Sequence, residues 1–223
     1  MMNIKKYKLI LMFHDITNYP KSNYDINWSK FKRIIFSFNI LFKFINKKIE
    51  QKILFTFDDG YHSSMKAARY LSRYFGIKSV IFISTNNINA YGYLKKSSIK
   101  FNTKNVLIGS HGVSHISLNN KLTNFEIHKE LKDSKSILSE LTKKEISFLS
   151  FPNGDYSKKA LKISSDLNFK YVFTSKRASN RIMQKDSTIN RFVILKNTPI
   201  LLLFLAYTGM LDRVQALKKR KWV

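Results

Sequence analysis

The sequence contains no cysteine and no apolar run long enough to cross a membrane. The lack of cysteine excludes a disulfide framework and a thiolate metal site, and it leaves the redox compartment open. The two strongest apolar runs, 9–13 and 200–206, are far shorter than the roughly 20 residues that a bilayer span requires. The first run is also too short for a signal-peptide core and lacks a small-residue cleavage site, so we expect a cytoplasmic protein.

Acidic residues are scarce, and this scarcity is the largest compositional bias of the chain. Its 223 residues include 40 Lys and Arg but only 14 Asp and Glu, which gives a formal net charge of +26. Such a charge is typical of proteins that bind nucleic acid or a membrane surface. The basic residues are mostly lysines spread along the chain among many Asn and Ile, which favours an AT-rich coding sequence as the simpler explanation.

We therefore expect no nucleic-acid partner, although a basic nucleic-acid binder remains an alternative that predicts steep salt dependence. An anionic glycan or a lipid-linked substrate would still be attracted by the positive charge. The basic end at 218–221 is either a solvated tail or a peripheral contact with an anionic membrane.

Segments typical of strands and of helices alternate along almost the whole chain. Seven short runs rich in apolar and β-branched residues predict strands at 8–13, 53–57, 80–83, 106–108, 146–151, 171–174 and 192–195. Amphipathic patterns and capping residues predict helices at 28–45, 63–75, 124–141 and 157–167, and we expect a buried helix at 200–206. This alternation is typical of parallel βαβ units. No repeat or linker is evident, so we expect a single domain over 1–223, with a core at about 8–198 and a helix and basic tail at 199–223.

Residues able to perform chemistry follow three of the expected strands. Asp58 and Asp59 follow one strand, His111 and His115 follow another, and the turn Pro152-Asn153-Gly154 follows a third. Because the carboxyl ends of parallel strands share one face, these segments are expected to meet there. Two His four residues apart can face one ion from a helical turn, and one added carboxylate makes a three-ligand site open to water. The second Asp then stays free to accept a proton.

Each pattern taken singly has a simpler explanation. An Asp-Asp-Gly sequence can be only a turn, a His pair can lie on the surface, and Pro-Asn-Gly is a common turn tripeptide. All three follow strands in a chain with only five His, which favours one shared site.

Three ordered motifs resemble those of the polysaccharide deacetylases, the NodB-homology family or carbohydrate esterase family 4. They are Thr56-Phe57-Asp58-Asp59-Gly60, Ser110-His111-Gly112-Val113-Ser114-His115 and Ser150-Phe151-Pro152-Asn153-Gly154. The resemblance extends from about Leu9 to beyond Arg191. It implies a distorted, incomplete (β/α) barrel of about seven parallel strands that removes acetyl groups from sugars with a divalent metal. Zinc is the first expectation, with Co²⁺ or Ni²⁺ as alternatives, and the implied substrate is an acetylated glycan or a lipid-linked sugar.

Carried over position by position, the resemblance implies a role for each motif residue. Asp58 would be the general base, and Asp59, His111 and His115 would bind the metal. The backbone N–H of Asn153 would help to stabilise the oxyanion.

The chain departs from the family pattern at three places. Ser150 stands where many members have an Arg that orients the base, which we interpret as a subfamily feature. Gly112 replaces the usual Ser or Thr, so we expect a looser metal loop. No His follows His128, so the late Leu-x-His motif that supplies a general acid is missing.

His14 is our candidate for the missing general acid. It ends the first expected strand, and it would reach the site if that strand neighbours the last one. The alternative is a strand-end His that bonds to the backbone. The departures also leave open a catalytically silent carbohydrate-binding protein, but a binding module has no need to keep the mutually repelling pair Asp58 and Asp59.

Overall fold

The structure, a computed structural model, describes residues 4–100, 105–175 and 188–211. Its centre is a parallel seven-stranded sheet in the order β6-β5-β4-β3-β2-β1-β7. The strands are β1 (Leu9–Phe13), β2 (Ile53–Phe57), β3 (Ser79–Ile83), β4 (Val106–Ser110), β5 (Phe148–Ser150), β6 (Tyr171–Phe173) and β7 (Phe192–Val193). The seven parallel strands that the sequence predicts are therefore confirmed.

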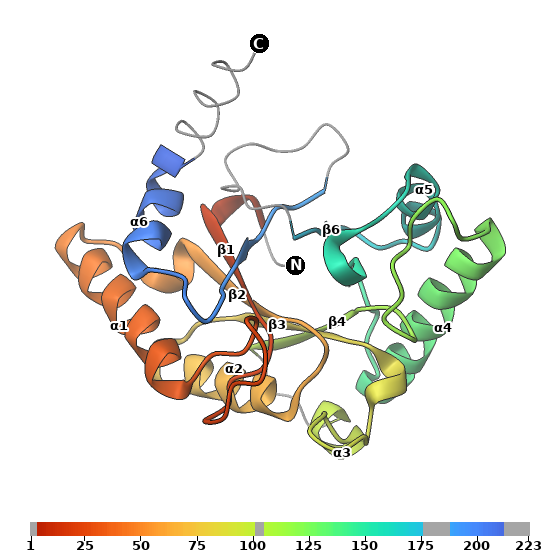
Figure 1. Cartoon of the computed structure of the whole chain (residues 1–223), viewed down its shortest axis with the longest axis horizontal. Helices are drawn as coiled ribbons and strands as arrows, with labels where there is room; N and C mark the ends of the chain where they lie inside the picture. Colours follow the sequence, from red (N-terminus) through yellow and green to blue (C-terminus); the bar gives the residue numbers. More distant parts are fainter. Residues whose placement is uncertain (1–3, 101–104, 176–187, 212–223) are drawn as a thin grey trace, which may run out of the picture.

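Helices surround the sheet on its outer side (Figure 1). They are α1 (Trp28–Phe44), α2 (His62–Phe75), α3 (Lys96–Lys100), α4 (Asn124–Thr142), α5 (Lys158–Asp166) and α6 (Ile200–Thr208). The short helix α3 lies in a polar segment where the sequence predicts no helix. The predicted start of α4 is confirmed, because Thr123 and Glu126 form a reciprocal capping box there. Within the described ranges, none of these helices has both the length and the apolar character that a membrane span requires.

The sheet curls until its two edges approach each other. β7 pairs with β1 at one edge, and Ile189, just before β7, forms a parallel bridge with Phe173 of β6 at the other. The amide of Thr174 donates to the carbonyl of Ile189 (3.0 Å), and the amide of Ile189 donates to the carbonyl of Val172 (2.8 Å). The result is the expected distorted (β/α) barrel, and it brings the end of β1 next to β7.

Side chains of the strands alternate between the helices and the barrel interior, as the period of two in a strand requires. Away from the carboxyl ends of the strands, the barrel interior is apolar and is filled by Ile4, Tyr7, Ile10, Leu54, Val80, Phe82, Phe148 and Phe173. Toward the carboxyl ends of the strands the buried residues become polar, and they include Thr56, Asp58, His111, Ser150 and Arg191. The barrel interior therefore has an apolar layer and, next to it at the carboxyl ends of the strands, a polar layer that contains the motif residues.

Helix α6 forms where the sequence predicts a helix, but the prediction that it is buried is wrong. Its buried side carries Leu203, Ala206 and Tyr207, whereas Leu201 is 68% exposed. The reason is that α6 packs against α1 by one side, where the ring centroids of Phe38 and Phe204 lie 5.1 Å apart. The basic end at 218–221 lies outside the described residues.

Candidate active site

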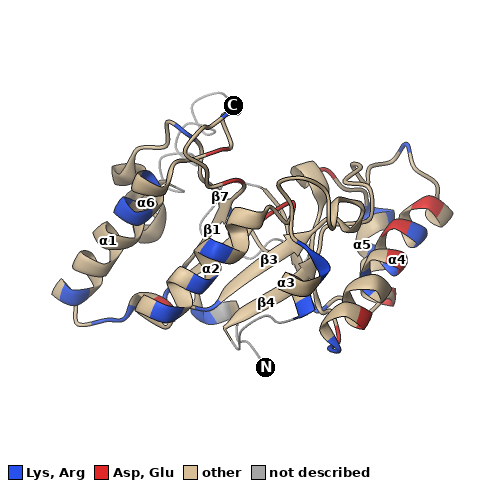
Figure 2. Ribbon diagram, turned by 90° about the horizontal axis from the view of Figure 1, so that it is seen from below, with Lys and Arg blue, Asp and Glu red and all other residues tan. Residues whose placement is uncertain are grey.

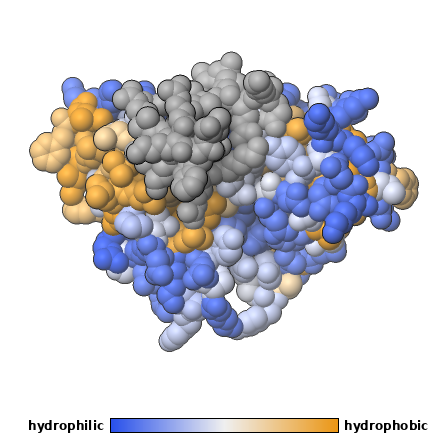
Figure 3. Space-filling view, turned by 45° about the horizontal axis from the view of Figure 1, so that its top comes forward, coloured by the Kyte–Doolittle hydropathy of each residue, from blue (hydrophilic) through white to orange (hydrophobic). Residues whose placement is uncertain are grey.

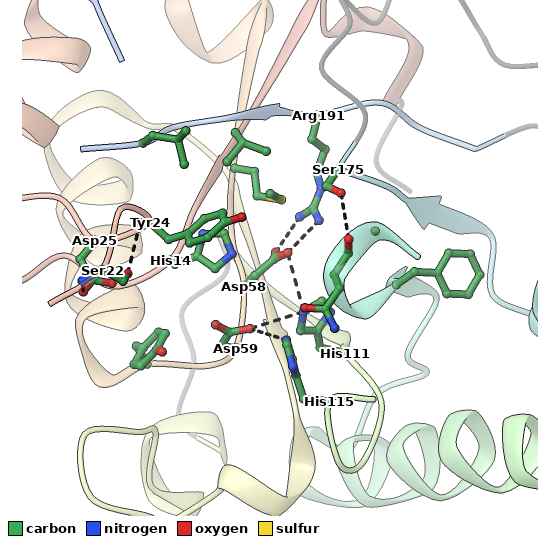
Figure 4. A pocket seen from close by; sticks show the side chains of 17 residues that line it. His14, Ser22, Tyr24, Asp25, Asp58, Asp59, His111, His115, Ser175 and Arg191 are labelled. Carbon is green, nitrogen blue, oxygen red and sulfur yellow. Dashed lines mark hydrogen bonds and ion pairs between the residues drawn. The ribbon is translucent and has the colours of Figure 1, made fainter. Parts of the chain in front are cut away.

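A cleft of about 480 Å³ opens at the carboxyl ends of the strands. Figure 4 shows side chains from several strand ends pointing into it. The cleft is lined by every residue to which the sequence analysis assigns a role, namely His14, Asp58, Asp59, His111, His115 and Asn153. The fold thus brings together three motifs and the end of β1.

Asp59 and the two His form a compact group of potential metal ligands. Asp59 Oδ1 lies 3.1 Å from His115 Nε2 and 3.5 Å from His111 Nε2. One ligand atom from each of the three residues lies within 4.8 Å of the others. Asp59 Oδ1 is buried and accepts no well-aligned hydrogen bond from the described residues. Burial opposes the ionisation of Asp59, but the facing imidazoles hold the pKa of its carboxyl far below the usual range.

The two imidazoles are held in different ways. His111 is buried, and its Nδ1 donates to the carbonyl of Ser150 at 2.7 Å, while its Nε2 faces Asp59. His115 is partly exposed and has a left-handed backbone with φ of 61°. The pair therefore lies on a loop, and the helical turn considered in the sequence analysis is wrong, because a right-handed helix excludes positive φ.

Glu130 of α4 anchors the loop that carries both His. Its Oε2 accepts hydrogen bonds from the amides of Val113 (2.8 Å) and Ser114 (3.1 Å), and its Oε1 accepts one from the Ser114 hydroxyl (2.6 Å). Gly112 has φ of +77°, and a Cβ at this position would come within 3.1 Å of Glu130 Oε2. Gly112 therefore permits this anchor, and the expected looser loop is not what the structure shows.

Asp58 is bound by a buried arginine that the sequence analysis missed. Arg191, 1% exposed, donates from Nη1 to Asp58 Oδ1 at 2.6 Å and from Nη2 to Oδ2 at 2.7 Å. Its Nη2 also donates to Ser150 Oγ at 2.7 Å, and its Nε donates to the carbonyl of Thr174 at 3.1 Å. This bidentate geometry is the strong form of an ion pair and fixes the orientation of the carboxylate.

The guanidinium of Arg191 also lies against aromatic rings, 5.2 Å from the centroid of Phe82 and 5.9 Å from that of Phe173. Burial alone would raise the pKa of Asp58, but Arg191 reverses this effect and holds the pKa below its usual range. Arg191 is the only charged residue in the mostly apolar segment 189–194, and this is the sequence signal that could have revealed it. Its guanidinium bonds the small side chain at Ser150, where many family members carry the Arg.

His14 reaches the cleft from the end of β1. Its ring packs on that of Tyr24 with centroids 4.8 Å apart. His14 Nδ1 is buried and has no hydrogen-bond partner among the described residues, so this nitrogen does not make the backbone bond of the alternative interpretation. Burial lowers the pKa of His14, and the nearby carboxylates of Asp58 and Asp59 oppose that shift in part.

Asn153 lies in the turn after β5 with φ of 58°. Its side-chain amide donates to Ser117 Oγ at 3.1 Å, which holds the turn against the loop after His115. Asp59 and His115 share this left-handed backbone conformation. Such conformations are uncommon for residues other than glycine and gather at functional sites.

Comparison with known proteins agrees with these features. The family model described as polysaccharide deacetylase matches residues 45–172, and the chain belongs to this family. The YxkH protein of Bacillus subtilis (strain 168), which is named for the same family, is 28% identical over 130 residues. That match covers 58% of this chain and 46% of YxkH, so the chain spans about half the length of this curated relative.

Solved structures show the same fold. The Streptococcus pyogenes deacetylase PplD, solved in complex with acetate, superposes with a TM-score of 0.77 at 19% identity, covering 90% of this chain and 97% of PplD. The polysaccharide deacetylase BC0361 from Bacillus cereus superposes with a TM-score of 0.74 at 20% identity, covering 89% of this chain and 68% of BC0361. At these identities the likeness concerns the fold.

Proposed function

We propose that this protein is a metal-dependent hydrolase that removes the acetyl group from an N-acetylated sugar in a polysaccharide or a lipid-linked saccharide. The main observation is that the group Asp59, His111 and His115 lies beside a second carboxylate in one cleft. Asp58 Oδ2 is 3.8 Å from His111 Nε2, close enough for both acids to act on one substrate group. Membership of the polysaccharide deacetylase family supports an acetylated carbohydrate as the substrate.

The residues fit a divalent cation. Two imidazole nitrogens and one carboxylate oxygen form a typical catalytic zinc set, and Co²⁺ or Ni²⁺ are alternatives. Asp59 Oδ1, buried without a well-aligned hydrogen bond among the described residues, would gain a partner. The bond from His111 to the Ser150 carbonyl is the outer contact that metal-binding imidazoles usually make. A bound cation would polarise the acetyl carbonyl and make the attacking water more acidic.

Asp58 is our general base. Arg191 keeps the carboxylate of Asp58 ionised through a bidentate pair of hydrogen bonds. A carboxylate has about four acceptor positions, so this pair leaves an acceptor position for a water. Asp58 takes one proton from the attacking water as the oxygen bonds to the acetyl carbon. The backbone N–H of Asn153 would donate to the oxyanion that develops on the former carbonyl oxygen.

His14 is our general acid. Its imidazolium would give a proton to the sugar nitrogen as the carbon–nitrogen bond breaks, which releases acetate and a free amine. Burial beside Tyr24 favours the neutral ring and thus makes the imidazolium a stronger acid.

Replacing His14 with glutamine should lower the rate of deacetylation about 100-fold, the lower end of what a general acid contributes, and leave metal binding intact. Only the protonated ring donates, so the contribution of His14 is full below its pKa and is lost as pH rises through it. Because burial lowers this pKa, the loss should begin below pH of about 6.5, the pKa of an ordinary imidazole. Initial rates across pH, with zinc content measured in parallel, test this expectation.

The exposed His62 provides the control, because His62→Gln should retain the rate and the pH profile. An unchanged rate and profile in His14→Gln would show that His14 is not the acid. The rate of His14→Gln should fall less on O-acetyl than on N-acetyl substrates, since an alkoxide leaves without protonation more readily than an amine anion.

A substrate screen tests the proposed function itself. Acetylated oligosaccharides of increasing length, carrying N-acetyl or O-acetyl groups, are incubated with the protein and Zn²⁺ or Co²⁺, and acetate and new amines are measured. We expect release of acetate from N-acetyl substrates that a chelator stops and added metal restores. Stoichiometric zinc binding with sugar binding but no acetate would instead identify the silent carbohydrate-binding alternative. The cytoplasmic location stays a prediction.

A further inference from the structure

The side of the barrel formed by α1 and α6 exposes large apolar side chains. On α1, Phe36, Ile40 and Phe44 follow at intervals of four residues and are 63%, 39% and 85% exposed. Leu201 of α6 and Met210, just past the end of that helix, are exposed as well. Figure 3 shows apolar atoms gathered over this part of the molecule. We call these five residues the α1–α6 face.

The sequence of α6 explains why this face is apolar. Eight of its nine residues, Ile200–Tyr207, are aliphatic or aromatic, and such a helix is expected to be covered on all sides. The rings of Phe42 and Tyr207, with centroids 5.1 Å apart, join α6 to α1 on one side only. The outward side of α6 therefore presents apolar surface that a binding partner would cover.

Basic residues extend the apolar stripe of α1. Arg33 and Lys43 are exposed and lie three residues from Phe36 and Ile40, so they share the side of the helix that carries the stripe, and the exposed Lys47 follows just past the end of α1. Neither α1, α2 nor α6 contains an acidic residue, and Glu50 is the only acid between positions 26 and 57. Figure 2 shows acidic residues concentrated on α4, on the other side of the molecule, and basic residues on α1 and α2. The charge near the α1–α6 face is thus strongly positive.

We propose that the α1–α6 face docks on the surface of a membrane rich in anionic lipids. Apolar side chains next to exposed Lys and Arg match the two parts of such a surface, the acyl boundary and the phosphate layer. A second copy of the chain would bring positive charge against positive charge, and a nucleic acid would leave the apolar side chains exposed.

Docking at this face would bring the cleft near lipid headgroups. Leu195 lines the cleft, and α6 begins five residues later, at Ile200. The ammonium of Lys30, in the first turn of α1, donates to the carbonyl of Leu195 at 3.1 Å, which ties α1 to this wall of the cleft. Membrane binding does not depend on the proposed deacetylation, so the two can be tested separately.

Vesicle sedimentation of the full chain tests the proposal. We expect binding to vesicles of phosphatidylcholine with phosphatidylglycerol, weaker binding at higher salt, and little binding to phosphatidylcholine alone. The variant Phe36→Ser/Phe44→Ser should weaken binding at least tenfold. Lys43→Gln/Lys47→Gln should weaken it about 25-fold, because each basic residue near an anionic surface contributes about five-fold.

Matched controls on other helices separate the face from general surface effects. Tyr74→Ser on α2 and Phe125→Ser on α4 remove exposed aromatic rings elsewhere and should leave vesicle binding unchanged. Circular dichroism and acetate release from water-soluble oligosaccharides check that the face variants remain folded. Full binding by both face variants would overturn the proposal. So would a stable dimer that Phe36→Ser/Phe44→Ser dissociates, because the face would then be covered by a second copy.

Discussion

Replacing Arg191 with alanine should lower the free energy of unfolding by about 3–5 kcal/mol and remove nearly all deacetylase activity. The substitution leaves Asp58 buried without its counter-charge, and truncating one partner of a buried ion pair is more damaging than removing the pair. Without Arg191, burial would raise the pKa of Asp58. The carboxyl would then be protonated over much of the working pH range and unable to act as a base.

The pH dependence of stability gives a second measure of the same contact. In the wild type, the depressed pKa of Asp58 adds stability that is present above its unfolded pKa of about 3.9 and is lost as pH falls through the folded pKa. In Arg191→Ala the buried carboxyl of Asp58 is unpaired, so its ionisation lowers the stability of the folded state instead of raising it. The free energies of unfolding of wild type and variant, measured with urea, should therefore differ strongly at pH 7 and less below pH of about 4.

Two further variants sharpen this test. Arg191→Lys keeps the charge but not the pair of parallel hydrogen bonds, so its activity should fall between those of wild type and alanine variant. Ser150 Oγ lies 2.7 Å from Arg191 Nη2, so a guanidinium placed on β5 can reach the same carboxylate. The exchange Ser150→Arg/Arg191→Ser should recover part of the stability and activity. Wild-type stability and activity in Arg191→Ala would rule out the role that we give this residue.

Asp59→Asn should abolish tight binding of zinc and reduce acetate release by about 1,000-fold or more, as expected when a Lewis acid worth several kcal/mol is lost. Asp59 is the only carboxylate of the three-residue group, and the neutral amide oxygen of Asn is a much weaker ligand. Asn has nearly the same shape, so packing around His111 and His115 should be preserved.

Zinc-dependent thermal stability measures this loss without the need for a substrate. Ligand binding to the folded state raises the melting temperature of the wild type as zinc is added, and Asp59→Asn should lose that rise. Asp166→Asn, on the exposed surface of α5, is the matched control and should behave as the wild type. If the purified Asp59 variant kept its metal-dependent acetate release, the proposed metal site would be wrong.

The strands and the position of the cleft followed directly from local patterns in the sequence. Apolar runs such as Ile53–Phe57 form strands because alternate side chains are buried on both faces of the sheet. The motif residues meet because every strand in the sheet runs in the same direction, so their carboxyl ends share one face. The place of His14 was left conditional on the first strand neighbouring the last, and the pairing of β1 with β7 met that condition.

Contacts between distant residues were decided only by the tertiary structure. Arg191 bonds Asp58 across 133 positions, and Glu130 anchors its loop through Ser114, which is 16 positions away. The exposed side of α6 likewise depends on the tertiary position of α1, which covers only one side of α6. The apolar composition of α6 alone predicts that the helix is buried. Local sequence fixes which residues form strands and turns, whereas the partner of a buried charge depends on which distant strands the barrel brings together.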